Sequence, residues 1–146
     1  MRNRVSIMHG VNFDVLHQRP KLVYGDFSLA ALERQIEGFA HELRLEVRFF
    51  QTNFEGEFVQ ELHRSPDYAD ALVLNPGAWT HYAWAIRDAV EITGLPAWEV
   101  HLSDIEAREE FRRVSVIRDV CAGAVWGKGP EGYRDALAGL RELLAA

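Results

Sequence analysis

The sequence predicts an α/β fold in which a parallel sheet is covered on both faces by helices. Short apolar segments alternate with longer amphipathic ones along the whole chain, which is the pattern of repeated strand–helix units. The 146 residues are enough to bury a proper core, and they predict one domain over residues 1–146.

The expected elements follow one another in a regular order. An apolar segment at 4–9 is the first strand, and Ser28 caps the first helix, whose apolar residues recur on one face. The sequence Gly94-Leu95-Pro96 ends the third helix. Strands are expected at 4–9, 45–51, 71–75, 97–101 and 120–126, and helices at 28–43, 55–64, 79–93 and 133–144. Five parallel strands of this kind predict a flavodoxin-like, doubly wound three-layer sandwich.

Composition and charge limit the classes of partner. A net charge of −6 does not suit a protein that binds phosphate backbones, so no nucleic acid partner is expected. No apolar run approaches the ~20 residues of a membrane span, and the N-terminus lacks the apolar region of a signal peptide. The single cysteine, Cys121, lies in an apolar run and is expected to be a buried structural thiol, which fits a reducing, cytoplasmic setting.

Several common chemistries lack their sequence signals. No glycine-rich dinucleotide fingerprint, Walker loop or serine nucleophile elbow is present. The only lysines, Lys21 and Lys128, lie in a polar loop and beside glycines, so neither is expected to form a Schiff base. Glu99 and His101 could ligate a metal, but no complete ligand shell accompanies them. A glutamate that orients a catalytic histidine is the more natural interpretation.

Polar side chains gather at the predicted strand ends, which is where doubly wound sheets bind their ligands. The candidates are Asn12, Arg19 and Tyr24 after the first strand, Asn75 and His81 after the third, and Glu99, His101, Ser103, Arg108 and Arg112 at and after the fourth. A base, an acid, an oxyanion stabiliser and an anion clamp can be drawn from this set.

The order and spacing of five short motifs are highly specific. They are NPGA at 75–78, TH at 80–81, RDA at 87–89, EVHLS at 99–103 and AREEFR at 107–112. With FFQTNFEGE at 49–57 and GKGPEGYRDAL at 127–137, the chain resembles the type II 3-dehydroquinate dehydratases almost end to end. The resemblance implies a cofactor-free, metal-free elimination of water from 3-dehydroquinate through an enolate, giving 3-dehydroshikimate.

The resemblance also implies a base for this reaction. Tyr24 would take the proton alpha to the ketone. Because a tyrosine with a pKa near ~10 is a poor base at neutral pH, a cation must stabilise its phenolate. Arg19 matches the family's position for that cation, and Arg108 is a second contributor. Asn12 would hold a water that stabilises the enolate.

The remaining site residues follow from the same resemblance. His101 would protonate the leaving hydroxyl, and Glu99 would orient it. Asp88 matches a residue that reaches a neighbouring subunit, in a family that assembles as homododecamers built from trimers. Binding of the substrate carboxylate falls to Ser103 and the backbone N–H of Leu102, and binding of the ring hydroxyls to Asn75, His81 and Arg112.

Seven positions near the site depart from the family pattern. They are Val11, His17, Pro20, Tyr82, Asp104, Glu106 and Val114. None is assigned direct chemistry, so the parent reaction is favoured. Two alternatives stay open: a paralogue that dehydrates a related cyclic hydroxy acid, such as an amino-dehydroquinate, and a catalytically silent relative that binds a small carboxylate.

Three further residues have ordinary structural interpretations. His9 ends the first strand, where it could bond a backbone carbonyl or act in the site. Tyr133 is expected to be a packing residue whose hydroxyl is satisfied, and Phe111 is expected to be part of the core.

Overall fold

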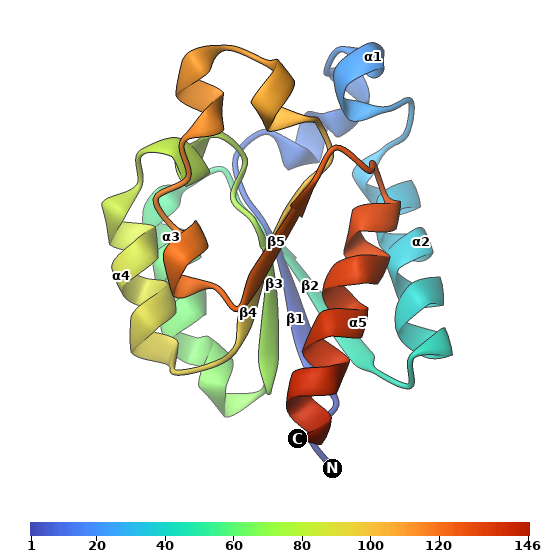
Figure 1. The fold of residues 1–146 in the computed structure, drawn as a ribbon, viewed down its shortest axis with the longest axis vertical. Helices are drawn as coiled ribbons and strands as arrows, with labels where there is room; N and C mark the ends of the chain where they lie inside the picture. Colours follow the sequence, from blue (N-terminus) through green and yellow to red (C-terminus); the bar gives the residue numbers. More distant parts are fainter.

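The computed structural model describes residues 1–146 and places five parallel strands between two pairs of helices (Figure 1). The strands are β1 (Arg4–His9), β2 (Glu46–Gln51), β3 (Ala71–Asn75), β4 (Ala97–His101) and β5 (Gly123–Trp126). They lie in the order β2-β1-β3-β4-β5, and each neighbouring pair is parallel. This is the flavodoxin-like order, so the predicted fold class is confirmed.

Each face of the sheet is covered by one pair of helices. Helices α2 (Leu29–Glu42) and α5 (Glu131–Ala145) cover one face, and α3 (Glu55–Arg64) and α4 (Trp84–Thr93) cover the other (Figure 1). Alternation along the strands fills both cores: Ile7 and Val73 pack toward α2 and α5, whereas Met8 and Leu74 pack toward α3 and α4. The interior strand β3 is therefore buried on both faces, which explains its hydrophobic run from Ala71 to Leu74.

Two element boundaries differ from the prediction. The expected helix at 79–93 is divided into a 3₁₀ turn, η3 (Gly77–His81), and α4, because the Thr80 carbonyl accepts from the Val116 N–H at 2.8 Å instead of continuing the helix. The expected strand at 120–126 starts only at Gly123, after the 3₁₀ turn η6 (Arg118–Val120). A Cβ at Gly123 would lie 2.3 Å from the Trp98 ring, so glycine permits the close approach of β5 to β4.

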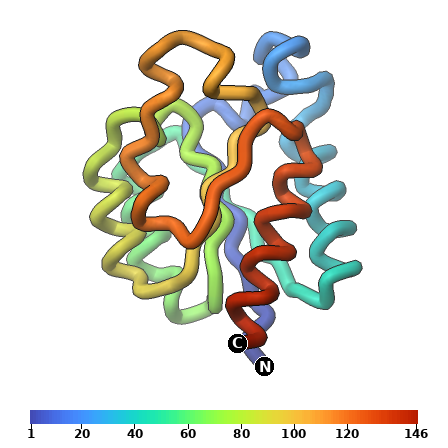
Figure 2. The backbone as a smooth tube through the Cα atoms, in the orientation of Figure 1, coloured from blue at the N-terminus to red at the C-terminus, as the bar shows by residue number.

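Irregular segments cover the carboxyl edge of the sheet. The loop after β1 contains η1 (Phe13–Gln18) and the short helix α1 (Lys21–Tyr24), and the chain after β4 contains η4 (Ile105–Ala107) and η5 (Glu110–Arg113). The two segments lie side by side at the top of Figure 2, and the two termini meet at the opposite edge. The turn η2 (Ser65–Asp67) follows α3. No helix has the length and apolar character needed to cross a membrane.

Candidate active site

A cavity of about 150 Å³ lies at the carboxyl edge of the sheet, under the two irregular segments. This is smaller than the roughly 300–1,000 Å³ that drug-sized ligands occupy, and it suits a small substrate. The cavity brings together most of the residues that the sequence singled out. Those that line it are Asn12, Arg19, Tyr24, Asn75, His81, His101, Leu102, Ser103, Arg108 and Arg112.

The cavity is electropositive although the chain is acidic. Three arginines and two histidines line it, and no aspartate or glutamate does. The net charge of the whole chain is −6. Cations gathered in a cleft raise the local concentration of anions, so the geometry suits a negatively charged ligand.

The hydroxyl of Tyr24 accepts hydrogen bonds from two arginines. Nη2 of Arg19 donates to the Tyr24 oxygen at 2.5 Å, and Nη1 of Arg108 donates to it at 2.8 Å. The same Nη1 donates to Oγ of Ser103 at 3.3 Å, which joins α1 to the segment that directly follows β4. Two charged donors therefore converge on one phenol oxygen that faces the cavity.

His101 and Glu99 form a buried pair on β4. Nε2 of His101 lies 2.6 Å from Oε2 of Glu99, and both residues face the side of the sheet that carries η3 and η6. Glu99 has no exposed surface and lies behind His101, outside the cavity lining. The predicted arrangement, a strand-borne glutamate behind a histidine, is therefore present.

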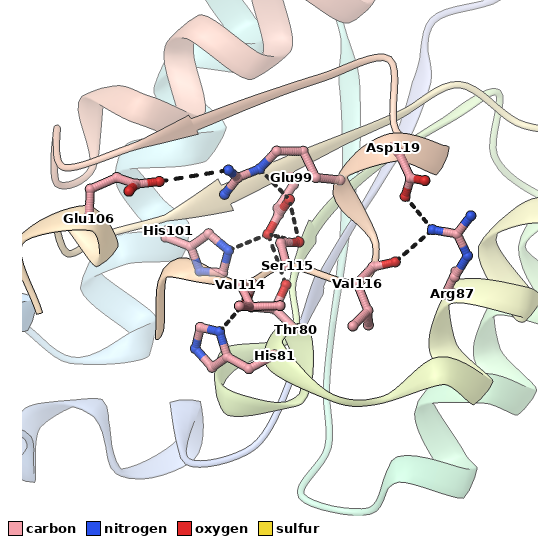
Figure 3. A network of polar contacts seen from close by, with 11 residues as sticks. Thr80, His81, Arg87, Glu99, His101, Glu106, Val114, Ser115, Val116 and Asp119 are labelled. Carbon is pink, nitrogen blue, oxygen red and sulfur yellow. Dashed lines mark hydrogen bonds and ion pairs between the residues drawn. The ribbon is translucent and has the colours of Figure 1, made fainter. Parts of the chain in front are cut away.

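Three side chains from outside β4 also donate hydrogen bonds to the Glu99 carboxylate. Thr80 Oγ1 donates at 2.8 Å, Ser115 Oγ donates to both oxygens at 2.8 and 3.0 Å, and Arg118 Nε donates at 3.4 Å. Figure 3 shows the Thr80, Ser115 and His101 side chains converging on Glu99. None of these three partners was among the predicted site residues, although Thr80 precedes His81 directly.

These contacts decide the charge state of Glu99. Burial raises the pKa of this carboxyl, but hydrogen bonds from His101, Ser115 and Thr80 and the charge of His101 outweigh burial and lower it to about 2. An ionised carboxylate behind the imidazole accepts its hydrogen bond and fixes its orientation. This contact leaves the other ring nitrogen of His101 free to face the cavity that the residue lines.

His81 is fixed in one tautomer. Its Nδ1 lies 2.7 Å from the Val114 carbonyl, and because a carbonyl only accepts, Nδ1 carries the hydrogen. Burial lowers the pKa of His81, and the charges of His101 and Arg112 lower it further against the opposing bond to Val114. A neutral His81 leaves Nε2 as an acceptor for a ligand hydroxyl.

The structure corrects one expectation beside this residue. Phe111 is not part of the core, because 54% of it is exposed. Its ring packs edge-on against His81 with centroids 5.7 Å apart, and the Arg112 guanidinium lies 4.7 Å above it. The Phe111 side chain therefore packs at the rim of the site, against His81, and not in the core.

The loop that carries Asn12 is held by residues of the β2 end. Asn12 has a left-handed backbone (φ 73°), and its N–H donates to Oδ1 of Asn53 at 2.8 Å. Gln51 Nε2 donates to the same Asn53 oxygen at 3.2 Å and to the Gly10 carbonyl at 3.2 Å. The motif FFQTNFEGE thus contributes by fixing the first loop, a role that the sequence did not indicate.

Two predicted residues do not line the cavity. Glu99 supports His101 from behind, whereas Asp88 is exposed on α4 and forms no part of this cavity. Nowhere do three or more His, Cys, Asp or Glu side chains cluster in a way that could hold a metal ion. Burial, with the charges of Glu99 and Asp119, raises the pKa of the partly buried Cys121 to about 12, so this thiol stays protonated.

Comparison with known proteins decides the family. A family model described as "Dehydroquinase class II" matches residues 3–141. The chain belongs to the class II dehydroquinase family. It is 42% identical over 142 residues to a 3-dehydroquinate dehydratase of Sulfurovum sp. (strain NBC37-1), covering 97% of this chain and 88% of that one. It is 47% identical over 140 residues to one of Thermotoga neapolitana, covering 96% and 95%.

Solved structures agree with this assignment. The crystal structure of a type II dehydroquinase from Butyrivibrio crossotus superposes with a TM-score of 0.91 at 35% identity, covering 95% of this chain and 97% of that one. One from Propionibacterium acnes gives 0.90 at 35% identity, covering 97% and 98%.

The departures from the dehydroquinase pattern lie mostly outside the cavity. Of the seven, only Val11 lines it. Asp104 accepts from the Glu106 N–H and starts η4, Glu106 lies 4.0 Å from Arg118, and Val114 contributes its backbone carbonyl to His81. The last contact does not depend on the side chain at position 114.

The buried carboxylate predicts a pH dependence of stability in this dehydroquinase. The folded-state pKa of Glu99 is lowered from 4.5 to about 2, so its stabilising contribution is complete above pH 4.5 and is lost as the pH falls toward 2. We expect Glu99→Gln to lose stability at neutral pH by about 1–3 kcal/mol and to flatten this acid-side slope. Urea unfolding at several pH values measures both quantities. Parallel stability curves for the two proteins would contradict the assignment.

Proposed function

We propose that this protein removes water from 3-dehydroquinate to give 3-dehydroshikimate, through an enolate and without a cofactor. One observation carries the proposal. A single small electropositive cavity is lined both by a tyrosine whose hydroxyl accepts from two arginines and by a histidine that is hydrogen-bonded to a buried carboxylate. The names of its relatives support the same reaction.

In the first step, Tyr24 acts as the base. Its phenolate, stabilised by Arg19 and Arg108, takes the proton alpha to the ketone and becomes a phenol. The electron pair of the broken C–H bond moves onto the ketone oxygen and forms the enolate. Asn12, in its left-handed loop position, holds a water that donates to this oxygen.

In the second step, His101 acts as the acid. The enolate collapses and expels the hydroxyl group, and His101 donates the proton that makes this group leave as water. The Glu99 carboxylate behind the ring stabilises the imidazolium before the transfer. Tyr24 has gained one proton and His101 has lost one, so proton exchange with solvent restores both groups.

The remaining lining residues bind the substrate. Ser103 and the backbone N–H of Leu102, at the end of β4, hold the carboxylate, and Asn75, His81 and Arg112 hold the ring hydroxyls. Because only one of the seven departures lines the cavity, we favour 3-dehydroquinate over a substituted ring.

We also propose that the protein acts as a homo-oligomer, a dodecamer built from trimers. Asp88 supports this inference, because it lies exposed on α4 and outside the cavity of its own chain. In this arrangement, its carboxylate contacts the site of a neighbouring copy.

Replacement of the base tests the proposed function. Tyr24→Phe removes the hydroxyl that accepts the proton and should lower kcat about 10²–10⁴-fold. Its affinity for quinate, a carboxylated ring that cannot be dehydrated by this route, should stay within about threefold. Turnover is followed by the ultraviolet absorbance of the conjugated product. Tyr82→Phe is the matched control, since Tyr82 is exposed and does not line the cavity. Unchanged turnover in Tyr24→Phe would show that Tyr24 is not the base.

The arginines of η5 provide a second test. Arg112 lines the cavity, whereas its neighbour Arg113 is exposed and does not. Arg112→Ala should raise KM about tenfold or more and lower kcat/KM, because a charged donor to the substrate is lost. Arg113→Ala should leave both constants near those of the wild type. Equal effects of the two changes in steady-state kinetics would argue against a binding role for Arg112.

A further inference from the structure

Three buried side chains form a hydrogen-bonded chain behind the cavity wall. His9 and Asn75 are the last residues of β1 and β3 and are paired in register. Tyr133, near the start of α5, has no exposed surface and reaches both of them. Its oxygen lies 2.7 Å from Nε2 of His9 and 3.1 Å from Nδ2 of Asn75. Only Asn75 of the three lines the cavity.

The chemistry of the groups fixes the direction of each bond. An amide nitrogen only donates, so the Tyr133 oxygen accepts from Asn75. Nε2 of His9 is the only other polar atom within hydrogen-bond distance of this oxygen, so the buried Tyr133 hydrogen has an acceptor only if it is directed to Nε2. Nε2 is therefore an acceptor, and the ring hydrogen is on Nδ1. Burial lowers the pKa of His9 to about 3, which keeps the imidazole neutral and able to accept.

The hydrogen bond that Asn75 makes on its other side supports the same direction. Oδ1 of Asn75 accepts from the Gly77 N–H at 3.3 Å. A flipped amide would place Nδ2 against this N–H and leave its oxygen facing Tyr133. With the observed orientation, Asn75 retains one N–H and one oxygen lone pair for a ligand.

We propose that His9 and Tyr133 are positioning residues that fix the orientation of the Asn75 amide and so govern recognition of ring hydroxyls in the cavity. The inference rests on the proposed function in one respect, namely that the ligand is a hydroxylated ring. It extends the determinants of substrate binding from the cavity wall to α5.

A packing role alone does not account for His9. Nδ1 of His9 is buried without a hydrogen-bond partner, and such a group costs stability that an apolar side chain would not. The ring stacks on Phe13 with centroids 4.7 Å apart, and Phe13 itself lines the cavity. The only polar contact that the imidazole makes is the one that directs the Tyr133 hydroxyl.

Kinetics of three variants test the proposal. Tyr133→Phe and His9→Leu should raise KM for 3-dehydroquinate about 3- to 10-fold and change kcat less than KM, because a binding contact is misoriented. His9→Gln should restore KM toward the wild-type value, since its amide oxygen can accept from Tyr133. An unchanged KM in the first two variants, or a His9→Gln protein that behaves like His9→Leu, would overturn the proposal.

Two ligands separate misorientation from general damage. Quinate carries ring hydroxyls, whereas cyclohexanecarboxylate has only the acid group. In the two disruptive variants, calorimetry should show weaker binding of quinate and unchanged binding of cyclohexanecarboxylate. Equal loss for both ligands would mean that the changes damage the cavity as a whole, and the positioning role would be rejected.

One measurement on the wild-type protein requires no variant to fold. Nitrogen NMR of the histidine rings should show His9 neutral, with hydrogen on Nδ1 and Nε2 as an acceptor; hydrogen on Nε2 would overturn the proposal. If the wild type fails to convert 3-dehydroquinate, the proposed function fails, but the quinate and NMR results still decide the positioning role.

Discussion

The site is organised around a buried carboxylate. Glu99 has no exposed surface, and an isolated charge in such a place would cost several kcal/mol. The cost is offset because donors reach the two oxygens from β4, from η3, from the segment before η6 and from η6 itself. One side chain therefore ties the irregular chain after β4 to the sheet. The backbone of Thr80 adds to this connection, because its carbonyl accepts from the N–H of Val116.

The proposed acid and the proposed base are held in position by different kinds of interaction. The proposed acid, His101, is buried on the interior strand β4 and held by Glu99, so its position is set by the core. The proposed base, Tyr24, lies on the four-residue helix α1, in which no residue is fully buried. Its position is instead set by Arg19 and Arg108, which contact its hydroxyl. Contacts with two arginines thus hold Tyr24 at the cavity, whereas the core holds His101.

The sequence predicted the layers well because strands buried on both faces leave a clear hydrophobic signal. It also predicted most of the cavity, since parallel strands bring their carboxyl ends to one edge. It did not predict the partners of Glu99: Thr80, Ser115 and Arg118 meet it only after the chain has folded back through several 3₁₀ turns. Local patterns also could not show that the Thr80 carbonyl would be taken by Val116, which is why the start of α4 was misplaced.

His9 illustrates the same limit from within a strand. Its position at the end of β1 was evident, but its partner, Tyr133, lies 124 residues away on α5. A strand-end histidine and a helix tyrosine each have an ordinary interpretation alone. Together with Asn75, they form a directed hydrogen-bonded chain whose effect is on the cavity.

The most direct test is to mix 3-dehydroquinate with the purified wild-type protein in a buffer that contains a metal chelator and no nucleotide, and to follow ultraviolet absorbance. We expect a steady rise, proportional to protein concentration, as the conjugated product 3-dehydroshikimate forms. A flat trace from protein shown to be folded would contradict it, and substituted dehydroquinates would then become the substrates to test.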